Sequence, residues 1–170
     1  MTIAIRRTNQ IKSTKVRLVV LLSGDIDSTA TLAIYHKKTA IIDAIFVDYG
    51  QPSRRSEWEA AQAIAEYYKI TIIKIRLGFR PKKTNGEVFF RNALMAMTVG
   101  AIIDDRTLFI TMVLHSADPY YDTSQAFVED LQRLFDGYTD DSVALGMAFL
   151  NVTKPEIIKY AVNFIESCGL

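Results

Sequence analysis

The residues best suited to chemistry form one short polar loop. Its members are Ser23, Gly24, Asp25, Ile26, Asp27, Ser28 and Thr29. An apolar run at 18–22 precedes the loop, and an apolar-periodic helix follows it from about residue 28 to 37. Free N–H groups at a helix start attract anions, and a glycine lets the backbone approach them closely. The loop therefore predicts a nucleotide phosphate site.

Two carboxylates in this loop set its chemistry. Asp27 offers oxygen ligands of the kind that magnesium prefers. Asp25 stands where a phosphate is expected, and a carboxylate ~4 Å from a phosphate charge costs about 1 kcal/mol in water and ~4 kcal/mol at an effective dielectric of 20. A magnesium ion would instead make the Asp25 carboxylate a ligand, and its effect on phosphate binding would then be favourable. The loop contains neither the Gly-Lys-Ser/Thr of a Walker motif nor the glycines of a dinucleotide fingerprint, so it represents another class of nucleotide site.

Strands and helices alternate along the whole chain and would position this loop. The apolar runs predict strands at 18–22, 40–48, 70–77, 107–114 and 142–152, with helices at 28–37, 53–68, 89–103, 124–135 and 154–166. Such alternation predicts an α/β fold: a doubly wound, mostly parallel five-stranded sheet with helices on both faces. We interpret residues 1–170 as one domain, with 1–16 as an arm or an edge strand.

Ligands bind such sheets outside the carboxyl ends of the strands. Three further loops fall at that edge, at 48–52, 78–87 and 115–123, and they are richer in polar groups than the rest of the chain. The loop at 78–87 is long enough to be functional. These loops are the predicted source of substrate contacts.

Composition limits the partners. A net charge of +1 and 49% apolar residues are ordinary for a soluble globular protein and argue against a nucleic-acid partner. The basic pairs at 54–55 and 82–83 are interpreted as solvated surface. There is no apolar run of the ~20 residues that a membrane span needs, and no signal-peptide pattern. The single Cys168 fits a reducing cytoplasm, and no Cys/His spacing predicts a zinc site.

The loop resembles the PP-loop of the ATP pyrophosphatases, Ser-Gly-Gly-x-Asp-Ser/Thr after the first strand. Ser23, Gly24, Asp27 and Ser28 match that pattern in place. Further motifs resemble those of the 7-cyano-7-deazaguanine synthases of the queuosine pathway, in order from about residue 17 to 161. They are Asp48-Tyr49-Gly50-Gln51, Arg91-Asn92, the set Asp118, Tyr120 and Asp122, and Thr153-Lys154-x-Glu156-Ile157.

The resemblance implies an adenine nucleotide alpha hydrolase-like fold and a carbon–nitrogen ligase. In that family the carboxylate of 7-carboxy-7-deazaguanine is adenylated by ATP, ammonia gives the amide, and a second activation gives the nitrile. It implies that Lys154 contacts phosphate and Asp27 holds Mg2+, and that both are catalytic. The residues implied around the base-like substrate are Gln51, Arg91, Asn92, Asp118, Tyr120 and Asp122. It also implies a homodimer.

Four departures from the family pattern leave other functions open. They are Asp25 for the second glycine, Pro52-Ser53 for Arg-His, Thr123-Ser124 for Cys-Arg, and Cys168 alone where the family has four zinc cysteines, so zinc is not expected. One alternative is a catalytically impaired nucleotide-binding protein that acts as a regulatory or partner subunit. Another is a different PP-loop amidation or a tRNA-modifying adenylation.

Each substrate residue also has a structural interpretation. Arg91 and Asn92 could simply open a helix, and Asp118 and Asp122 could form turns. Lys154 could be solvated, and the pair at 120–121 could form a dimer contact. Sequence spacing alone does not choose between these roles.

Overall fold

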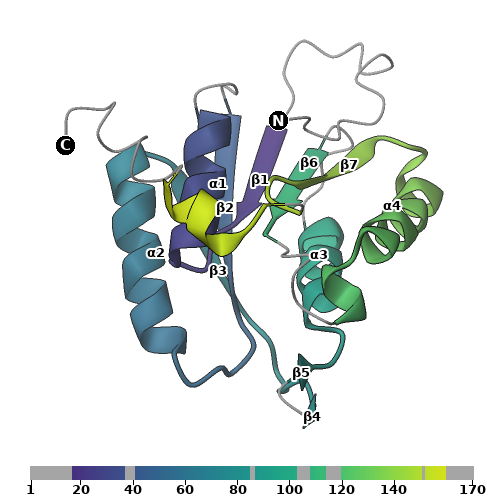
Figure 1. The fold of residues 1–170 in the computed structure, drawn as a ribbon, viewed down its shortest axis with the longest axis horizontal. Helices are drawn as coiled ribbons and strands as arrows, with labels where there is room; N and C mark the ends of the chain where they lie inside the picture. The colour runs from purple at the N-terminus through teal and green to yellow at the C-terminus, as the bar shows by residue number, and fades with distance from the viewer. Residues whose placement is uncertain are drawn as a thin grey trace.

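Five parallel strands form the central sheet of the computed structural model, which describes residues 17–36, 41–84, 87–102, 108–113, 120–150 and 152–159. The strands are β1 (Arg17–Leu21), β2 (Ile41–Asp48), β3 (Thr71–Arg76), β6 (Leu108–Met112) and β7 (Val143–Met147). Their order across the sheet is β3-β2-β1-β6-β7 (Figure 1). The predicted parallel α/β sheet is therefore confirmed.

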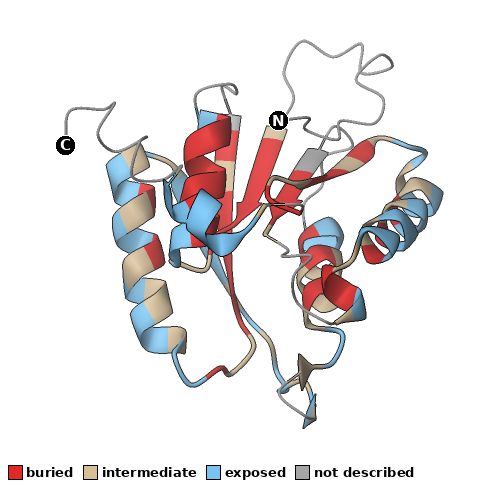
Figure 2. Ribbon diagram, in the orientation of Figure 1, coloured by how far each residue is buried: buried red, intermediate tan, exposed pale blue. Residues whose placement is uncertain are grey.

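Helices cover both faces of the sheet. Because strand side chains alternate in direction, β1 sends Leu18 and Val20 to one face and Val19 and Leu21 to the other. The first face packs on α1 (Ile26–His36), α2 (Arg54–Tyr68) and the helical residues 154–159, and the second packs on α3 (Arg91–Ile102) and α4 (Gln125–Thr139). Buried residues concentrate in the central strands and in α1 (Figure 2).

Several element boundaries differ from prediction. Helix α1 begins at Ile26, two residues early, and α4 continues to Thr139. Strand β7 ends at Met147, short of the predicted 152, because residues 148–150 turn the chain and bury Phe149 on the α1/α2 face. The turn thus brings the last helix to the face that carries α1.

Two short connections also carry structure that the sequence did not predict. The loop at 78–87 contains an antiparallel hairpin of β4 (Lys83–Thr84) and β5 (Glu87–Val88), and helix α3 begins after it, at Arg91. A 3-10 turn, η1 (Tyr121–Thr123), precedes α4. Its next residue caps α4 as predicted, because the Ser124 hydroxyl accepts the Phe127 N–H at 3.2 Å.

Some predictions fall outside the described residues: the arm at 1–16, Asp118, and the part of the last helix beyond residue 159. None of the helices described is long and apolar enough to cross a membrane.

Candidate functional site

The phosphate-type loop lies directly on helix α2. Gly24 has a φ of +85°, and a Cβ there would stand 2.5 Å from the Glu57 carbonyl oxygen and 2.9 Å from the Ala61 nitrogen. Both atoms belong to the α2 backbone, which cannot swing aside as a side chain can. Glycine is therefore required here by helix packing, a reason additional to the predicted close approach of an anion.

Asp25 forms the N-cap of α1. Its Oδ1 accepts the Ser28 N–H at 2.8 Å, and its carbonyl oxygen accepts the Thr29 N–H at 3.1 Å and the Thr29 hydroxyl at 2.6 Å. These contacts explain why the helix begins at Ile26. The Asp25 carboxylate thus accepts a hydrogen bond from the Ser28 N–H, a group that would otherwise be available to bind an anion.

The loop hydroxyls lie together beside this cap. Ser23 Oγ donates to Ser28 Oγ at 3.0 Å, and Ser28 Oγ lies 3.2 Å from the Asp25 carbonyl oxygen. The fold therefore gathers polar groups of the predicted phosphate loop at the carboxyl end of β1, as doubly wound sheets do with ligand sites.

Asp27 and Lys154 form an ion pair between residues 127 apart in sequence. Lys154 Nζ donates to Asp27 Oδ2 at 2.6 Å; the Asp27 carboxylate is 5% exposed and the Lys154 side chain is 53% exposed. The pair joins the phosphate loop to the start of the last helix. Lys154 therefore makes a specific contact in addition to its contact with solvent. The two residues that were predicted to be catalytic lie in direct contact with each other.

The start of that last helix is fixed by its own residues. Glu156 Oε2 accepts the Thr153 N–H at 2.8 Å and the Thr153 hydroxyl at 2.6 Å. These hydrogen bonds stabilise the charged form and lower the pKa of Glu156. The predicted helix start at Thr153 is confirmed, and it holds Lys154 in the first turn.

Three predicted substrate residues come together where α3 begins. Asn92 Nδ2 donates to the Asp122 carbonyl oxygen at 3.0 Å, and the Asn92 N–H lies 3.4 Å from Asp122 Oδ2. Arg91 Nε donates to Asn92 Oδ1 at 3.2 Å. Asn92 and Asp122 are buried, and Tyr120, two residues before Asp122 in the chain, is half-buried. The cluster supports the start of α3 and presents polar groups from α3 and η1.

Gln51 holds the turn that follows β2. Its Oε1 accepts the Tyr49 N–H at 3.1 Å, and its Nε2 donates to Glu57 Oε2 at 2.8 Å. The half-buried Glu57 of α2 thus anchors the buried Gln51. A predicted substrate contact from Gln51 would thus have to share an amide that the turn already uses.

Buried Asp48 lies in the same turn and attracts cations that sequence reasoning missed. Its Oδ1 accepts the Gly50 N–H at 3.0 Å, while its Oδ2 lies 3.8 Å from Lys74 Nζ and 4.0 Å from Arg76 Nε. Lys74 and Arg76 are two residues apart on β3, so strand alternation places their side chains on the same face. That spacing is the sequence signal from which a shared carboxylate partner could have been predicted. Within the described ranges, no group of three or more His, Cys, Asp and Glu residues could form a metal cluster.

The chain is similar in sequence to proteins of known family. The family described as queuosine biosynthesis protein QueC matches residues 17–89, from β1 through the hairpin. A 7-cyano-7-deazaguanine synthase of Desulfitobacterium hafniense (strain DSM 10664 / DCB-2) is 28% identical over 86% of this chain and 74% of its own length. One from Methanosphaerula palustris is 27% identical over 86% of this chain and 79% of its own length.

Among solved structures, the U34-tRNA thiolase NcsA from Methanococcus maripaludis with its [4Fe-4S] cluster matches with a TM-score of 0.53 and 17% identity. The match covers 91% of this chain, and this chain spans 58% of that structure. At this identity the likeness concerns the fold alone, an α/β arrangement with a parallel sheet.

Proposed function

Because the chain belongs to the QueC family of 7-cyano-7-deazaguanine synthases, we propose that it uses ATP to adenylate a carboxylate that is then converted by ammonia. Enzymes of this family use ATP. The observation that carries the proposal is the 2.6 Å contact between Asp27 and Lys154, which unites two distant parts of the family pattern. The preferred substrate is 7-carboxy-7-deazaguanine or a related deazapurine carboxylate.

The proposed chemistry needs positioning and charge stabilisation more than proton transfer. An oxygen of the substrate carboxylate attacks the α-phosphorus of ATP, and the bond to pyrophosphate breaks. Ammonia then attacks the carbonyl carbon, AMP leaves with the bonding electrons, and the nitrogen loses a proton to give the amide. The amide oxygen then attacks the α-phosphorus of a second ATP, and a second pyrophosphate leaves. The C–O bond breaks, AMP leaves with the bonding electrons, and loss of the two N–H protons gives the nitrile.

Each group of the loop has a role in this scheme. The hydroxyls of Ser23, Ser28 and Thr29 and the ammonium of Lys154 bind phosphate oxygens and stabilise the charge of the leaving pyrophosphate. Asp27 is suited to Mg2+ because it is a hard oxygen donor, and magnesium usually takes one or two carboxylates and completes its shell with water and substrate phosphates. Bound there, the ion would neutralise phosphate charge.

The cluster at the start of α3 is the proposed substrate side of the site. Arg91, Asn92 and Asp122 combine a cation, an amide and a carboxylate within one hydrogen-bonded group. Such a group can recognise the polar edge of a base-like ring, and Tyr120 supplies a ring for stacking. The homodimer is an additional part of the proposal and is testable by the mass of the protein in solution.

The direct test measures pyrophosphate release from ATP with a panel of carboxylates, 7-carboxy-7-deazaguanine first, with products identified by mass spectrometry. We expect pyrophosphate only when a carboxylate is present, and a loss of about a hundredfold or more in rate for Lys154→Met. Lys159→Met, in the same helix and also exposed, is the matched control and should keep its rate. Intact ATP binding without turnover of any carboxylate would overturn the proposed reaction.

A second candidate is a nucleotide-binding protein that regulates a partner without catalysis. It is favoured by one contact, the hydrogen bond from the Ser28 N–H to Asp25 Oδ1, which fills an anion position of the loop with the chain's own carboxylate. Bound ATP that is recovered unhydrolysed, with every carboxylate tested, would support this role.

A further inference from the structure

The charge of the chain is unevenly distributed. The segment 67–86 contains no Asp or Glu but holds six of the 20 basic residues, so the rest of the chain is net acidic. These cations are Lys69, Lys74, Arg76, Arg80, Lys82 and Lys83. A net charge of +1 therefore conceals a strongly basic segment, and local potential decides what a surface attracts.

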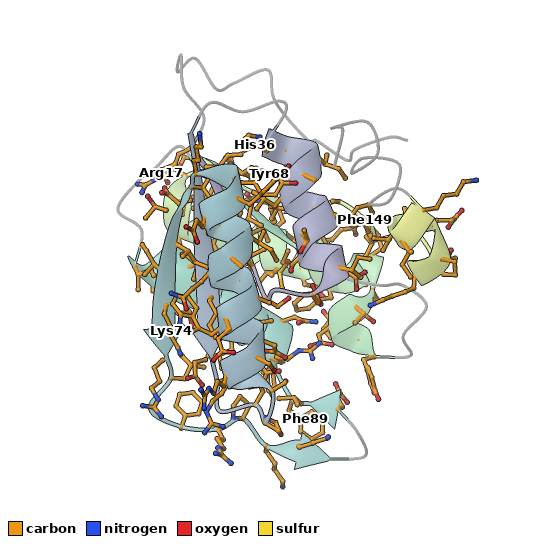
Figure 3. All side chains as sticks on the ribbon, turned by 90° about the vertical axis from the view of Figure 1, so that its left-hand side faces the viewer. Arg17, His36, Tyr68, Lys74, Phe89 and Phe149 are labelled. Carbon is orange, nitrogen blue, oxygen red and sulfur yellow. The ribbon has the colours of Figure 1, made fainter. Side chains whose placement is uncertain are left out.

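The fold concentrates the second half of this segment at the carboxyl edge of the sheet. β3 is an edge strand of the sheet and neighbours β2. The Leu77 N–H donates to the Asp48 carbonyl oxygen at 2.9 Å, so the chain leaves β3 beside the end of β2. The Arg80 side chain lies over Gly50, where a Cβ would meet its Nε at 2.6 Å. Figure 3, which is viewed from the α2 side, labels Lys74 on β3 and Phe89 near the hairpin at the lower end of the molecule.

In the part of the chain that the structure describes, Asp48 is the carboxylate that pairs with Lys74 and Arg76, and Glu87 lies opposite Thr84 in the hairpin. Arg76 is 77% exposed and lies a loose 4.0 Å from Asp48, whose carboxylate it shares with Lys74. Arg80, Lys82 and Lys83 are exposed. Exposed cations thus outnumber carboxylates from the end of β3 through the hairpin.

Exposed aromatic rings lie within the same stretch of chain. Phe79 is 59% exposed, and Phe90, which follows the hairpin, is 78% exposed. The Phe89 N–H donates to the Lys82 carbonyl oxygen at 3.0 Å, which brings the chain before Phe90 back to the lysines. The exposed rings and the exposed cations therefore belong to the same connection, which the hairpin folds back on itself.

Phe90 is a residue that folding alone does not favour. Its φ is +57°, in the left-handed region that phenylalanine rarely adopts, and its ring gains little from burial. A glycine would occupy this position with less strain. The Phe90 ring is therefore available for contact with a ligand.

We propose that this basic aromatic face, defined as Arg76, Phe79, Arg80, Lys82, Lys83 and Phe90, binds single-stranded nucleic acid. Cations that follow a phosphate backbone, combined with rings on which bases stack, are the usual construction of such sites. Exposed rings favour unpaired bases over a duplex, whose bases are already stacked. They also favour nucleic acid over an acidic protein, for which cations alone would suffice.

The first test measures fluorescence anisotropy of a fluorescein-labelled single-stranded RNA and DNA, without ATP, at several salt concentrations. Lys82→Glu/Lys83→Glu should weaken binding about tenfold or more and flatten the salt dependence, because each phosphate contact contributes to that slope. Arg133→Glu/Lys159→Glu makes the same change in net charge elsewhere and should change binding less than about twofold. If the two double variants lost affinity equally, the effect would be one of net charge alone, and the proposal would be overturned.

The second test concerns the ring. Phe90→Gly should weaken binding about fivefold or more without lowering Tm, since stacking is lost and backbone strain is relieved. Tyr138→Ala, from another 78% exposed ring, is the matched control and should leave binding unchanged. No binding by the wild-type chain at low salt, equal or tighter binding of duplex, or easier displacement by polyglutamate would each refute the proposal. These measurements need no turnover, so they are independent of the pyrophosphate assay.

Discussion

The loop carboxylate Asp25 decides how well the site can accept a phosphate. Its Oδ1 holds the Ser28 N–H at 2.8 Å, so a phosphate oxygen seeking the same N–H must displace it. We predict that Asp25→Gly binds MgATP more tightly than the wild-type chain. Asp25→Asn, which keeps the capping oxygen and removes the charge, should have an intermediate affinity.

The magnitude follows from two contributions. Displacing a capping side chain costs about 1 kcal/mol, and an exposed carboxylate ~4 Å from a phosphate charge costs about 1 kcal/mol more. Asp25→Gly removes both and should tighten binding about thirtyfold, whereas Asp25→Asn removes the second and should gain about fivefold. Stability should fall by only a few tenths of a kcal/mol in Asp25→Gly, because glycine is a tolerable N-cap.

Isothermal titration calorimetry with MgATP distinguishes these cases. Asp140→Asn, an exposed aspartate at the C-terminal end of α4, removes the same charge elsewhere and should leave the affinity unchanged. Weaker binding in both Asp25 variants would refute the reasoning, because the carboxylate would then act as a ligand, through a magnesium ion, and not as a competitor of the phosphate.

Three further predictions concern the frame of the site. Gly24→Ala should lower the free energy of unfolding by about 3 kcal/mol in urea titration, since it combines a positive φ with a 2.5 Å approach to the Glu57 carbonyl oxygen; an unchanged free energy would contradict the packing. Lys154→Met and Asp27→Asn should couple by about 1 kcal/mol in a double-mutant cycle, discounted for the half-exposed lysine, whereas additive losses would mean that the pair contributes nothing. The pKa of Glu156 is lowered from 4.5 by hydrogen bonds to its helix cap, so its charge stabilises the fold above about pH 4.5 and the benefit is lost as the pH falls through the folded pKa. The Tm difference between wild type and Glu156→Gln should therefore shrink on acidification, and a constant difference would argue against the cap.

Local patterns predicted the parts of the fold that depend on neighbouring residues. The alternation of strands and helices and the helix starts at Ser124 and Thr153 were predicted from spacing. The Ser124 hydroxyl accepts the Phe127 N–H, and Glu156 accepts the Thr153 N–H, so hydrogen bonds support both helix starts. Errors occurred where a distant group intervened. Strand β7 ends early because the chain turns to bury Phe149 against α1 and α2.

The candidate site shows the same division. The sequence predicted the members of the phosphate loop and of the cluster at Arg91, Asn92 and Asp122, because a family pattern fixes residue types in order. It could not give their contacts. Asn92 meets Asp122 across 30 residues and Lys154 meets Asp27 across 127, and such contacts depend on how the helices pack.

The α/β class, the polar loop after the first strand and the capped helices could be predicted from the sequence alone. They follow from periodicity and from hydrogen bonds within a few residues. Three other features came from the three-dimensional fold alone: the strand order β3-β2-β1-β6-β7, the packing of Gly24 on α2, and the contact of Lys154 with Asp27. Those features depend on which surfaces meet, and the meeting is set by the burial of two apolar clusters that draw on the whole chain.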